Sequence, residues 1–369
     1  MPYFDYNATT PPHPAALAAW RETAEQFWHN PSSPYRAAAR AHALMEEARE
    51  QLAALVGGSP ENYVFTSGAT EANNAVFAHF AKSSPPGAQV VVSAIEHPSV
   101  LEAASYWFPG RTHLWEVNPR GTAPPLQMLG REVVLVSVQA ANNETGVLQP
   151  WNENAIRVQA AGARYHCDAS QWLGKLAPGK LVDCDFVTGL GHKFGGPKGV
   201  GFLKIPPGCD FHGQRGGEQE HNHRAGTENL PAIRAMVAAL AARSAELETR
   251  RAEWEGARAG FETALLSAIP GTVVVGAGIP RLWNTVMFLP PRHANTRWVA
   301  ALDRRGFQIS TGSACATGHA GPSHVLAAMG VEAEAARRAV RVSGGWETTV
   351  ADWAALAKAL SEAAVELDG

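Results

Sequence analysis

Short runs of apolar, β-branched residues alternate along this chain with longer stretches in which apolar residues recur every three or four positions. The short runs predict strands and the longer stretches predict amphipathic helices. This alternation is typical of an α/β fold with a mostly parallel central sheet flanked by helices. The expected strands are Tyr63–Thr66, Gln89–Ser93, Val133–Val138, Phe186–Thr188 and Gly201–Ile205. Helices are expected at Arg36–Leu55 and Glu71–Ala81.

The pattern changes after a long Ala-rich amphipathic segment that runs from about Ile233 to Leu266. Beyond this segment we expect four short strands and two helices: Val273–Val275, Val286–Leu289, Phe307–Ser310, Ala339–Val342, Asn295–Arg305 and Val350–Glu366. A chain of 369 residues is also long enough for more than one domain. We therefore predict a large domain over 11–245 and a small α/β domain over 246–369, which residues 1–10 join.

Composition narrows the classes of protein. Hydrophobic residues make up 46% and charged residues 18%, and the formal net charge is −3, so no basic surface for nucleic acid is expected. The opening MPYFDYNATTPPHP has neither a cationic lead nor an apolar run, and no apolar stretch is long enough for a membrane span. The four cysteines include no C-x-x-C pair, so we expect no metal cage and no disulfide framework. These features predict a cytoplasmic protein.

Candidate chemistry gathers in segments that follow predicted strands. Lys193 lies in the Gly-rich turn TGLGHKFGGPKGVG, where an amine can be kept from the surface and become nucleophilic. Asp168 ends a strand in ARYHCDASQ, and FTSGATEANN turns from a strand into a helix whose free amides suit a phosphate. His97 in SAIEHPSVL could stack on an aromatic ring, and Asn143 in QAANNETGVLQP could bond a cofactor oxygen.

Each of these motifs also has a plainer explanation. The lysine fits an exposed hairpin, Asp168 and Thr70 fit helix caps, His97 fits a structural histidine, and Asn143 fits an ordinary turn. Their combination is more specific, because pyridoxal phosphate (PLP) needs a Schiff-base lysine, an acid for its ring nitrogen, a phosphate cup and a stacking group. We therefore predict a PLP enzyme whose cofactor-binding residues meet at the strand ends of one doubly wound sheet.

The whole set of motifs resembles the cysteine desulfurases of the NifS/IscS type, within the class V aminotransferase group of fold-type I PLP enzymes. The resemblance runs from YFDYNATTP to RVSGGWETT and includes FTSGATEANN, EHPSVLE, NNETGVLQ, HCDASQ, GHKFGGPKGVG, RAGTEN and TGSAC in family order. It implies a homodimer that converts L-cysteine to L-alanine. The sulfur would pass through a persulfide on Cys315 to an acceptor that is a protein or a small molecule.

The resemblance also implies roles for single residues. Lys193 would form the Schiff base, Asp168 would pair with the ring nitrogen, Gln171 would bond the ring hydroxyl and His97 would stack on the ring and deprotonate the incoming thiol. The phosphate would be held by Thr70, by His192, by the amides around Ala69 and by Thr227 from the second subunit. The substrate carboxylate would be bound by Asn143 and Arg341.

Two positions depart from the family pattern. Leu190 stands where the family usually has a serine that meets the phosphate, so we expect PLP to bind but to be lost more readily. Glu218 replaces the third glycine of the usual GGGQE. A different PLP reaction stays open as an alternative: a selenocysteine lyase, a C–S lyase or an aminotransferase. A scaffold without catalysis is a third reading, and Cys315 in TGSAC favours sulfur transfer over both.

Overall fold

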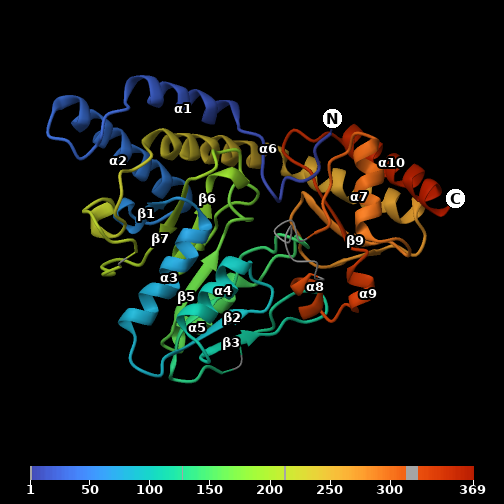
Figure 1. The fold of residues 1–369 in the computed structure, drawn as a ribbon, viewed down its shortest axis with the longest axis horizontal. Helices are drawn as coiled ribbons and strands as arrows, with labels where there is room; N and C mark the ends of the chain where they lie inside the picture. Colours follow the sequence, from blue (N-terminus) through green and yellow to red (C-terminus); the bar gives the residue numbers. More distant parts are fainter. Residues whose placement is uncertain (1, 127, 212, 313–322) are drawn as a thin grey trace.

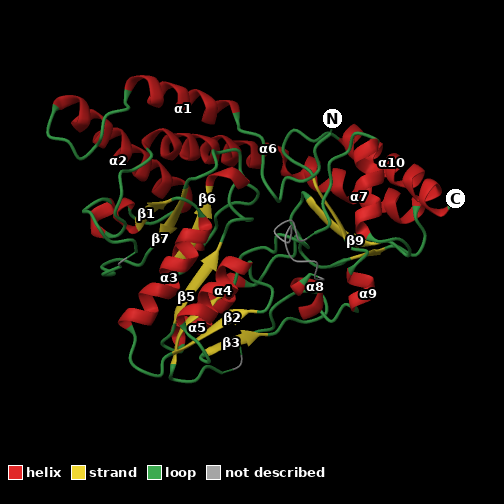
Figure 2. Cartoon of the chain, in the orientation of Figure 1, coloured by secondary structure: helices red, strands yellow, loops and turns green. Residues whose placement is uncertain are grey.

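The computed structural model describes residues 2–126, 128–211, 213–312 and 323–369. Within these ranges seven strands form the central sheet, with helices on both of its faces (Figures 1 and 2). The strands are β1 (Tyr63–Thr66), β2 (Gln89–Ser93), β3 (Thr112–Trp115), β4 (Val133–Ser137), β5 (Arg164–Asp168), β6 (Phe186–Leu190) and β7 (Gly201–Lys204). The helices that cover them are α1 (Pro14–Gln26), α2 (Arg36–Val56), α3 (Ala69–Ser83), α4 (Pro98–Trp107) and α5 (Trp151–Ala160).

Strand direction decides where the functional residues meet. The order across the sheet is β1-β7-β6-β5-β4-β2-β3. β7 runs antiparallel to its neighbours β1 and β6, and the other neighbouring pairs are parallel. The carboxyl ends of β1, β2, β4, β5 and β6 therefore lie along one edge of the sheet, which is where an open α/β sheet binds its ligands.

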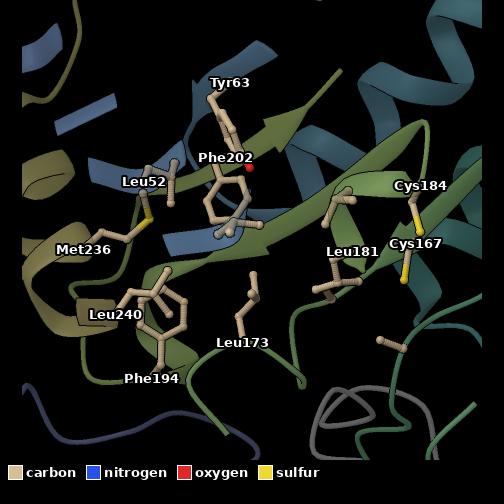
Figure 3. Close-up of a cluster of buried hydrophobic side chains, with 14 of the residues drawn as sticks. Leu52, Tyr63, Cys167, Leu173, Leu181, Cys184, Phe194, Phe202, Met236 and Leu240 are labelled. Carbon is tan, nitrogen blue, oxygen red and sulfur yellow. The ribbon is translucent and has the colours of Figure 1, made fainter. Parts of the chain in front are cut away.

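Alternating side chains bury both faces of the sheet. In β1, Tyr63 and Phe65 pack with α2 and the long helix α6 (Leu230–Ala268), whereas Val64 packs with α3 and α4. Because successive strand residues point to opposite faces, this arrangement needs apolar residues at nearly every strand position. The sequence supplies them, and Figure 3 shows part of the α2–α6 side, where Leu52, Tyr63, Phe202, Met236 and Leu240 gather.

A second, three-stranded antiparallel sheet has the order β10-β9-β8 and is built from β8 (Val273–Val274), β9 (Thr285–Leu289) and β10 (Val340–Ser343). Its helices are α7 (Asn295–Arg304), α8 (His324–Ala328), α9 (Ala333–Ala336) and α10 (Val350–Asp368). A separate hydrophobic core lies here, and the N-terminal segment contributes Phe4 to it. Ser343 N–H donates to the Phe4 carbonyl at 2.8 Å, which joins the start of the chain to β10.

Helix α6 connects the two sheets without a break (Figure 1). Its residues up to Trp254 pack in the core of the large sheet, and those from Ala257 onward pack in the core of the small one. The boundary predicted near residue 245 falls inside this helix, and the division of the chain into two domains stays a prediction. No helix within the described ranges is both long and apolar enough to span a bilayer.

Most predicted elements are present within a few residues of their predicted bounds. The predicted strand Phe307–Ser310 is wrong: Gln308 pairs only with Tyr3 and Ser310 only with Arg341, as two isolated bridges. The turn at Gly306 brings the segment beside β10 too briefly for a continuous ladder. The predicted elements do not include β3 or the helices α1, α4, α5, α8 and α9. α1 begins where the His13 side chain accepts from Ala15 N–H and Pro14 occupies the first turn.

Candidate active site

The structure brings the predicted cofactor residues to the carboxyl edge of the large sheet. They follow strands that run in one direction: Thr70 after β1, His97 after β2, Asn143 after β4, Asp168 at the end of β5 and Lys193 after β6. Arg341 lies on β10 of the small sheet and reaches the Asn143 carbonyl at 3.0 Å. The site therefore lies where the two sheets face each other.

Lys193 occupies a short 3-10 turn, Gly191–Lys193, between β6 and β7. Its side chain is half-buried, and its Nζ donates to the carbonyl of Asn7 at 2.6 Å and to that of Ala8 at 2.8 Å. Both acceptors are neutral backbone groups from the N-terminal segment. The turn thus presents the amine to the site and not to solvent, as the Gly-rich sequence predicts.

Asp168 is buried and is oriented by two donors. Ser170 N–H donates to Oδ1 at 2.9 Å, and the Asn73 amide of α3 donates to Oδ2 at 2.9 Å. The same amide lies 2.9 Å from Ser99 Oγ, which in turn lies 2.9 Å from His97 Nδ1. A chain of hydrogen bonds therefore links Asp168 to His97. The sequence analysis missed Asn73 and Ser99, although both stand inside motifs that it quoted.

His97 is the N-cap of α4, and Pro98 follows it in the first helical turn. Ser99 N–H donates to His97 Nδ1 at 3.1 Å. A backbone N–H can only donate, so Nδ1 is unprotonated and the neutral ring carries its proton on Nε2. Burial lowers the pKa of His97, with Asp168 opposing and Lys193 adding to this shift. His97 is thus a neutral ring that donates at Nε2.

The turn from β1 into α3 is where the sequence predicts a phosphate cup. Gly68 precedes the helix at φ 153°, and no side chain caps the first amides of α3, which begins at Ala69. A Cβ on Gly201 would lie 2.8 Å from Gly68 Cα, so the two glycines permit a close approach of backbones. Thr70 is exposed beside the free amides. This cradle accepts an anion because N–H groups and the helix dipole converge on it.

His192 and Gln171 lie beside Lys193. His192 Nδ1 is 3.1 Å from Thr9 Oγ1, and burial together with the charges of Lys193, Lys198 and Lys175 lowers its pKa to about 4. Gln171 donates from Nε2 to the Asn7 carbonyl at 2.9 Å and accepts from the fully buried Lys175. Lys175 was not predicted from the sequence. Because its Nζ donates to the oxygen of the Gln171 amide, the nitrogen of that amide faces the Asn7 carbonyl, which also accepts from Lys193.

Arg341 is buried, with 1% of its side chain exposed. Its Nη1 donates to the carbonyls of Asn143 (3.0 Å) and Gly312 (2.9 Å), and its Nη2 donates to Asp5 Oδ1 at 2.6 Å. Nε has no partner among the described residues. The guanidinium therefore keeps donors for a further anion on the edge formed by Nε and Nη2.

Three residues that the sequence singles out remain to be placed: Cys315, Thr227 and Glu218. Cys315 lies outside the described residues, between Gly312 and Ser323. Thr227 is exposed and lines a cavity of about 100 Å³ together with Thr66 and Ser67. Glu218 is exposed, whereas Glu220 in the same loop is buried and pairs with Arg49 at 2.7 Å. The departure at Glu218 therefore falls on the surface.

The other three cysteines are free thiols. Cys167 and Cys184 are buried, and Figure 3 shows them side by side within the core of the large sheet. Cys209 is half-buried and lies 3.8 Å from His79 Nε2. Burial raises the pKa of Cys167 and of Cys209, which disfavours their thiolates.

Glu96 leads to a prediction about stability. It is fully buried, Oε1 accepts from Gln139 N–H at 2.5 Å, and Oε2 has no partner in the described part of the chain. Burial, and then the charge of Asp168, raises its pKa well above 4.5. Above about pH 4.5 the unfolded chain loses the Glu96 proton, whereas the folded state keeps it. The free energy of unfolding therefore falls as pH rises.

Glu96→Gln should remove this loss, because glutamine is neutral and keeps an oxygen for Gln139. The variant's advantage in unfolding free energy should grow by up to about 1.4 kcal/mol per pH unit from about pH 5 upward. Chemical denaturation at several pH values measures it, with exposed Glu61→Gln as the control. An advantage that does not change with pH would contradict a protonated Glu96.

Leu190 leads to a prediction about cofactor retention. Its side chain is buried at the end of β6, three residues before Lys193, and it offers the phosphate no donor. Leu190→Ser should slow the loss of PLP on dialysis by about fivefold, equal to one hydrogen bond of about 1 kcal/mol. Leu190→Ala leaves the same space without a hydroxyl and is the matched control. Equal loss from the serine and alanine variants would contradict the prediction.

Comparison with known proteins agrees with this geometry. The family described as aminotransferase class-V matches residues 2–356. A cysteine desulfurase of Enterobacter agglomerans is 35% identical over 349 residues, which are 92% of this chain and 87% of that protein. A solved NifS-like protein has a TM-score of 0.89 at 29% identity and covers 98% of both chains. A structure named SspA in complex with cysteine has a TM-score of 0.79 at 26% identity, covering 93% of this chain and 98% of the other.

The fold and the match over nearly the whole length define the class: the chain belongs to the aminotransferase class-V family, with the architecture of fold-type I PLP enzymes. Within that family, curated relatives that are 35 to 36% identical to this chain are named cysteine desulfurases. The predicted fold class and family resemblance are confirmed.

Proposed function

We propose that this chain is a PLP-dependent cysteine desulfurase, which converts L-cysteine to L-alanine and carries the sulfur as a persulfide on Cys315. The observation that carries the proposal is the meeting of Lys193 and Asp168, at the edge of the large sheet, with Arg341 of the small sheet, in a chain whose relatives bear that name. An amine, an oriented carboxylate and a buried guanidinium are the groups that an amino-acid-processing PLP site needs.

The residues present fit PLP. The uncapped start of α3 and the close approach of Gly68 and Gly201 leave a cradle for the phosphate, beside Thr70 and His192. Asp168, held by Asn73 and Ser170, is rigid enough to meet a ring nitrogen. When bound, PLP supplies an electron sink for the negative charge that develops at the substrate Cα.

Each group at the sheet edge has a proposed task. Lys193 holds the cofactor through its amine, Gln171 bonds the ring hydroxyl, and His97 stacks on the ring. The amide of Ala69 bonds the phosphate together with Thr70 and His192. In a homodimer, the exposed Thr227 reaches the phosphate site of the second subunit.

The substrate is held and deprotonated by residues of this chain. Arg341 binds the carboxylate of L-cysteine through Nε and Nη2, and Asn143 contributes its amide beside it. Lys193 would be the base that removes the proton from Cα. His97 donates from Nε2 in its neutral form. To take the thiol proton, as the sequence analysis predicted, Nδ1 must first release Ser99.

Sulfur transfer then needs only the thiolate of Cys315. It attacks the substrate sulfur, the new S–S bond forms as the Cβ–S bond breaks, and the bonding pair stays with carbon, which is protonated to give alanine. The sulfur left on Cys315 passes to an acceptor that is a protein or a small molecule. A cytoplasmic location, without a membrane or nucleic-acid partner, completes the proposal.

The test supplies L-cysteine without reductant to PLP-loaded protein and measures alanine and the mass of the Cys315 peptide. Alanine with one extra sulfur on Cys315 is expected. Cys315→Ala should lose both signals, whereas Cys209→Ala, the matched control at a half-buried thiol, should keep them. Pyruvate in place of alanine would assign a lyase, and alanine from Cys315→Ala with selenocysteine alone would assign a selenocysteine lyase. No turnover with PLP bound would favour a scaffold.

A further inference from the structure

A cluster of two arginines and one glutamate lies away from the proposed catalytic residues. Arg258 and Glu262 are one turn apart on α6, and Arg281 lies between β8 and β9. Arg281 Nη2 donates to both Glu262 oxygens, at 2.8 and 2.9 Å, and Arg258 Nη1 lies 3.6 Å from Oε1. The three side chains together carry one excess positive charge.

The cluster has more donors than acceptors. Nε and Nη1 of Arg258, and Nε and Nη1 of Arg281, are buried without a hydrogen-bond partner in the described ranges. Only 4% of the Arg281 side chain is exposed. Buried polar groups in folded proteins are nearly always paired, and an unpaired charged donor is costly. Arg258 Nη1 has only the 3.6 Å ion pair with Glu262, and the other three donors have no partner in the described ranges. These donors, beside an excess charge, indicate that an acceptor from outside the chain completes the cluster.

We infer that Arg258, Arg281 and Glu262 form a binding site for a small oxyanion, a phosphate or a carboxylate. Guanidinium groups bind planar or tetrahedral oxyanions in a two-pronged manner, and a single anion neutralises the excess charge. Arg258 and Glu262 are partly exposed, at 17% and 18% of their side chains, whereas Arg281 is buried beside them with 4% exposed. Burial, and then the charge of Arg281, lower the pKa of Arg258, and the charges of Glu262 and Glu255 oppose this shift.

The site is connected to the loop that carries Asn143. The backbone of Arg281 pairs with Val147, Leu148 N–H donates to the Pro280 carbonyl at 3.0 Å, and Leu282 N–H donates to the Gly146 carbonyl at 2.8 Å. A Cβ on Gly276 would meet Arg281 Cδ at 3.2 Å, so this glycine leaves room for the arginine. A bound anion therefore steadies the segment next to the proposed substrate site. The inference itself goes beyond the proposed desulfurase reaction and does not depend on it.

The experiment titrates inorganic phosphate into PLP-loaded protein at constant ionic strength and follows the midpoint of thermal unfolding. The loaded form is used because the phosphate cup at α3 would bind phosphate in the apoprotein. The wild type should show a saturable rise in the midpoint. Arg251→Gln, which removes an exposed arginine paired with Glu255 on the same helix, should respond like the wild type.

Three variants separate an anion site from an internal ion pair. Glu262→Gln removes the competing carboxylate and should lower the half-saturating phosphate concentration at least about threefold. Arg258→Gln keeps the Arg281–Glu262 pair and should raise that concentration about tenfold, and Arg281→Gln should abolish saturation. Acetate in place of phosphate distinguishes a carboxylate site from a phosphate site. An unchanged response in Arg281→Gln, or none of the expected tightening in Glu262→Gln, would overturn the inference.

Discussion

Replacing Lys193 with alanine should lower alanine formation from L-cysteine by at least about 10⁴-fold, because both the covalent hold on PLP and the base for Cα are lost. Borohydride reduction of the loaded wild type should attach the cofactor to the Lys193 peptide, and the variant should carry none. Lys193→Arg keeps the positive charge near the Asn7 and Ala8 carbonyls and is the matched control for folding.

Two results would contradict this role for Lys193. One is alanine formation within tenfold of the wild type. The other is reduction of the cofactor onto Lys175, the fully buried lysine whose Nζ lies 3.0 Å from Asn7 Oδ1. Burial, together with Lys193 and Arg341, lowers the pKa of Lys175 well below its ordinary value, which favours the neutral amine. The peptide mass distinguishes the two lysines directly.

Replacing Arg341 with glutamine should raise KM for L-cysteine by about 10²- to 10³-fold, since a buried two-pronged ion pair with the carboxylate is lost. Cysteamine, which has no carboxylate, isolates the effect: its turnover should be equally slow with the wild type and the variant. Steady-state kinetics with both amines measures the difference.

Asp5→Asn is the matched control, because Asp5 forms the internal ion pair with Arg341. It leaves the Arg341 guanidinium in place and removes only the carboxylate that lies 2.6 Å from Nη2. KM for L-cysteine should change by less than about tenfold, because Asp5 is partly exposed and its charge is screened. If Arg341→Gln slowed cysteamine as strongly as cysteine, Arg341 would serve the fold and not the substrate.

Local sequence predicted much of the architecture. The strands Tyr63–Thr66 and Gln89–Ser93 have their predicted bounds, because apolar residues at nearly every position suit strands buried on both faces. The helix Arg36–Val56 extends one residue beyond its prediction. The site was predicted as a set of residues at strand ends, because motifs such as HCDASQ place chemistry where a parallel sheet opens. The predicted roles of those residues stay predictions.

Residues that act across long sequence separations were not predictable in this way. Asn73 reaches Asp168 from 95 positions away, and Asp5 reaches Arg341 from 336. No periodicity or local motif encodes such a pairing, since it depends on how helices and sheets pack. The same reason explains Lys175, which reaches Asn7 from 168 positions away, and the short bridges at Gln308 and Ser310 that replaced a predicted strand.

The sequence by itself determined the alternation of strands and helices, the class of sheet and the residues that offer an amine, an acid, an imidazole and a guanidinium. These follow from side-chain periodicity and from chemistry that belongs to single residues. Only the tertiary structure decided which donors of Arg341 stay available and which arginines near α6 lack acceptors. Those properties depend on distances between segments that are remote in sequence, and such distances exist only once the chain has folded.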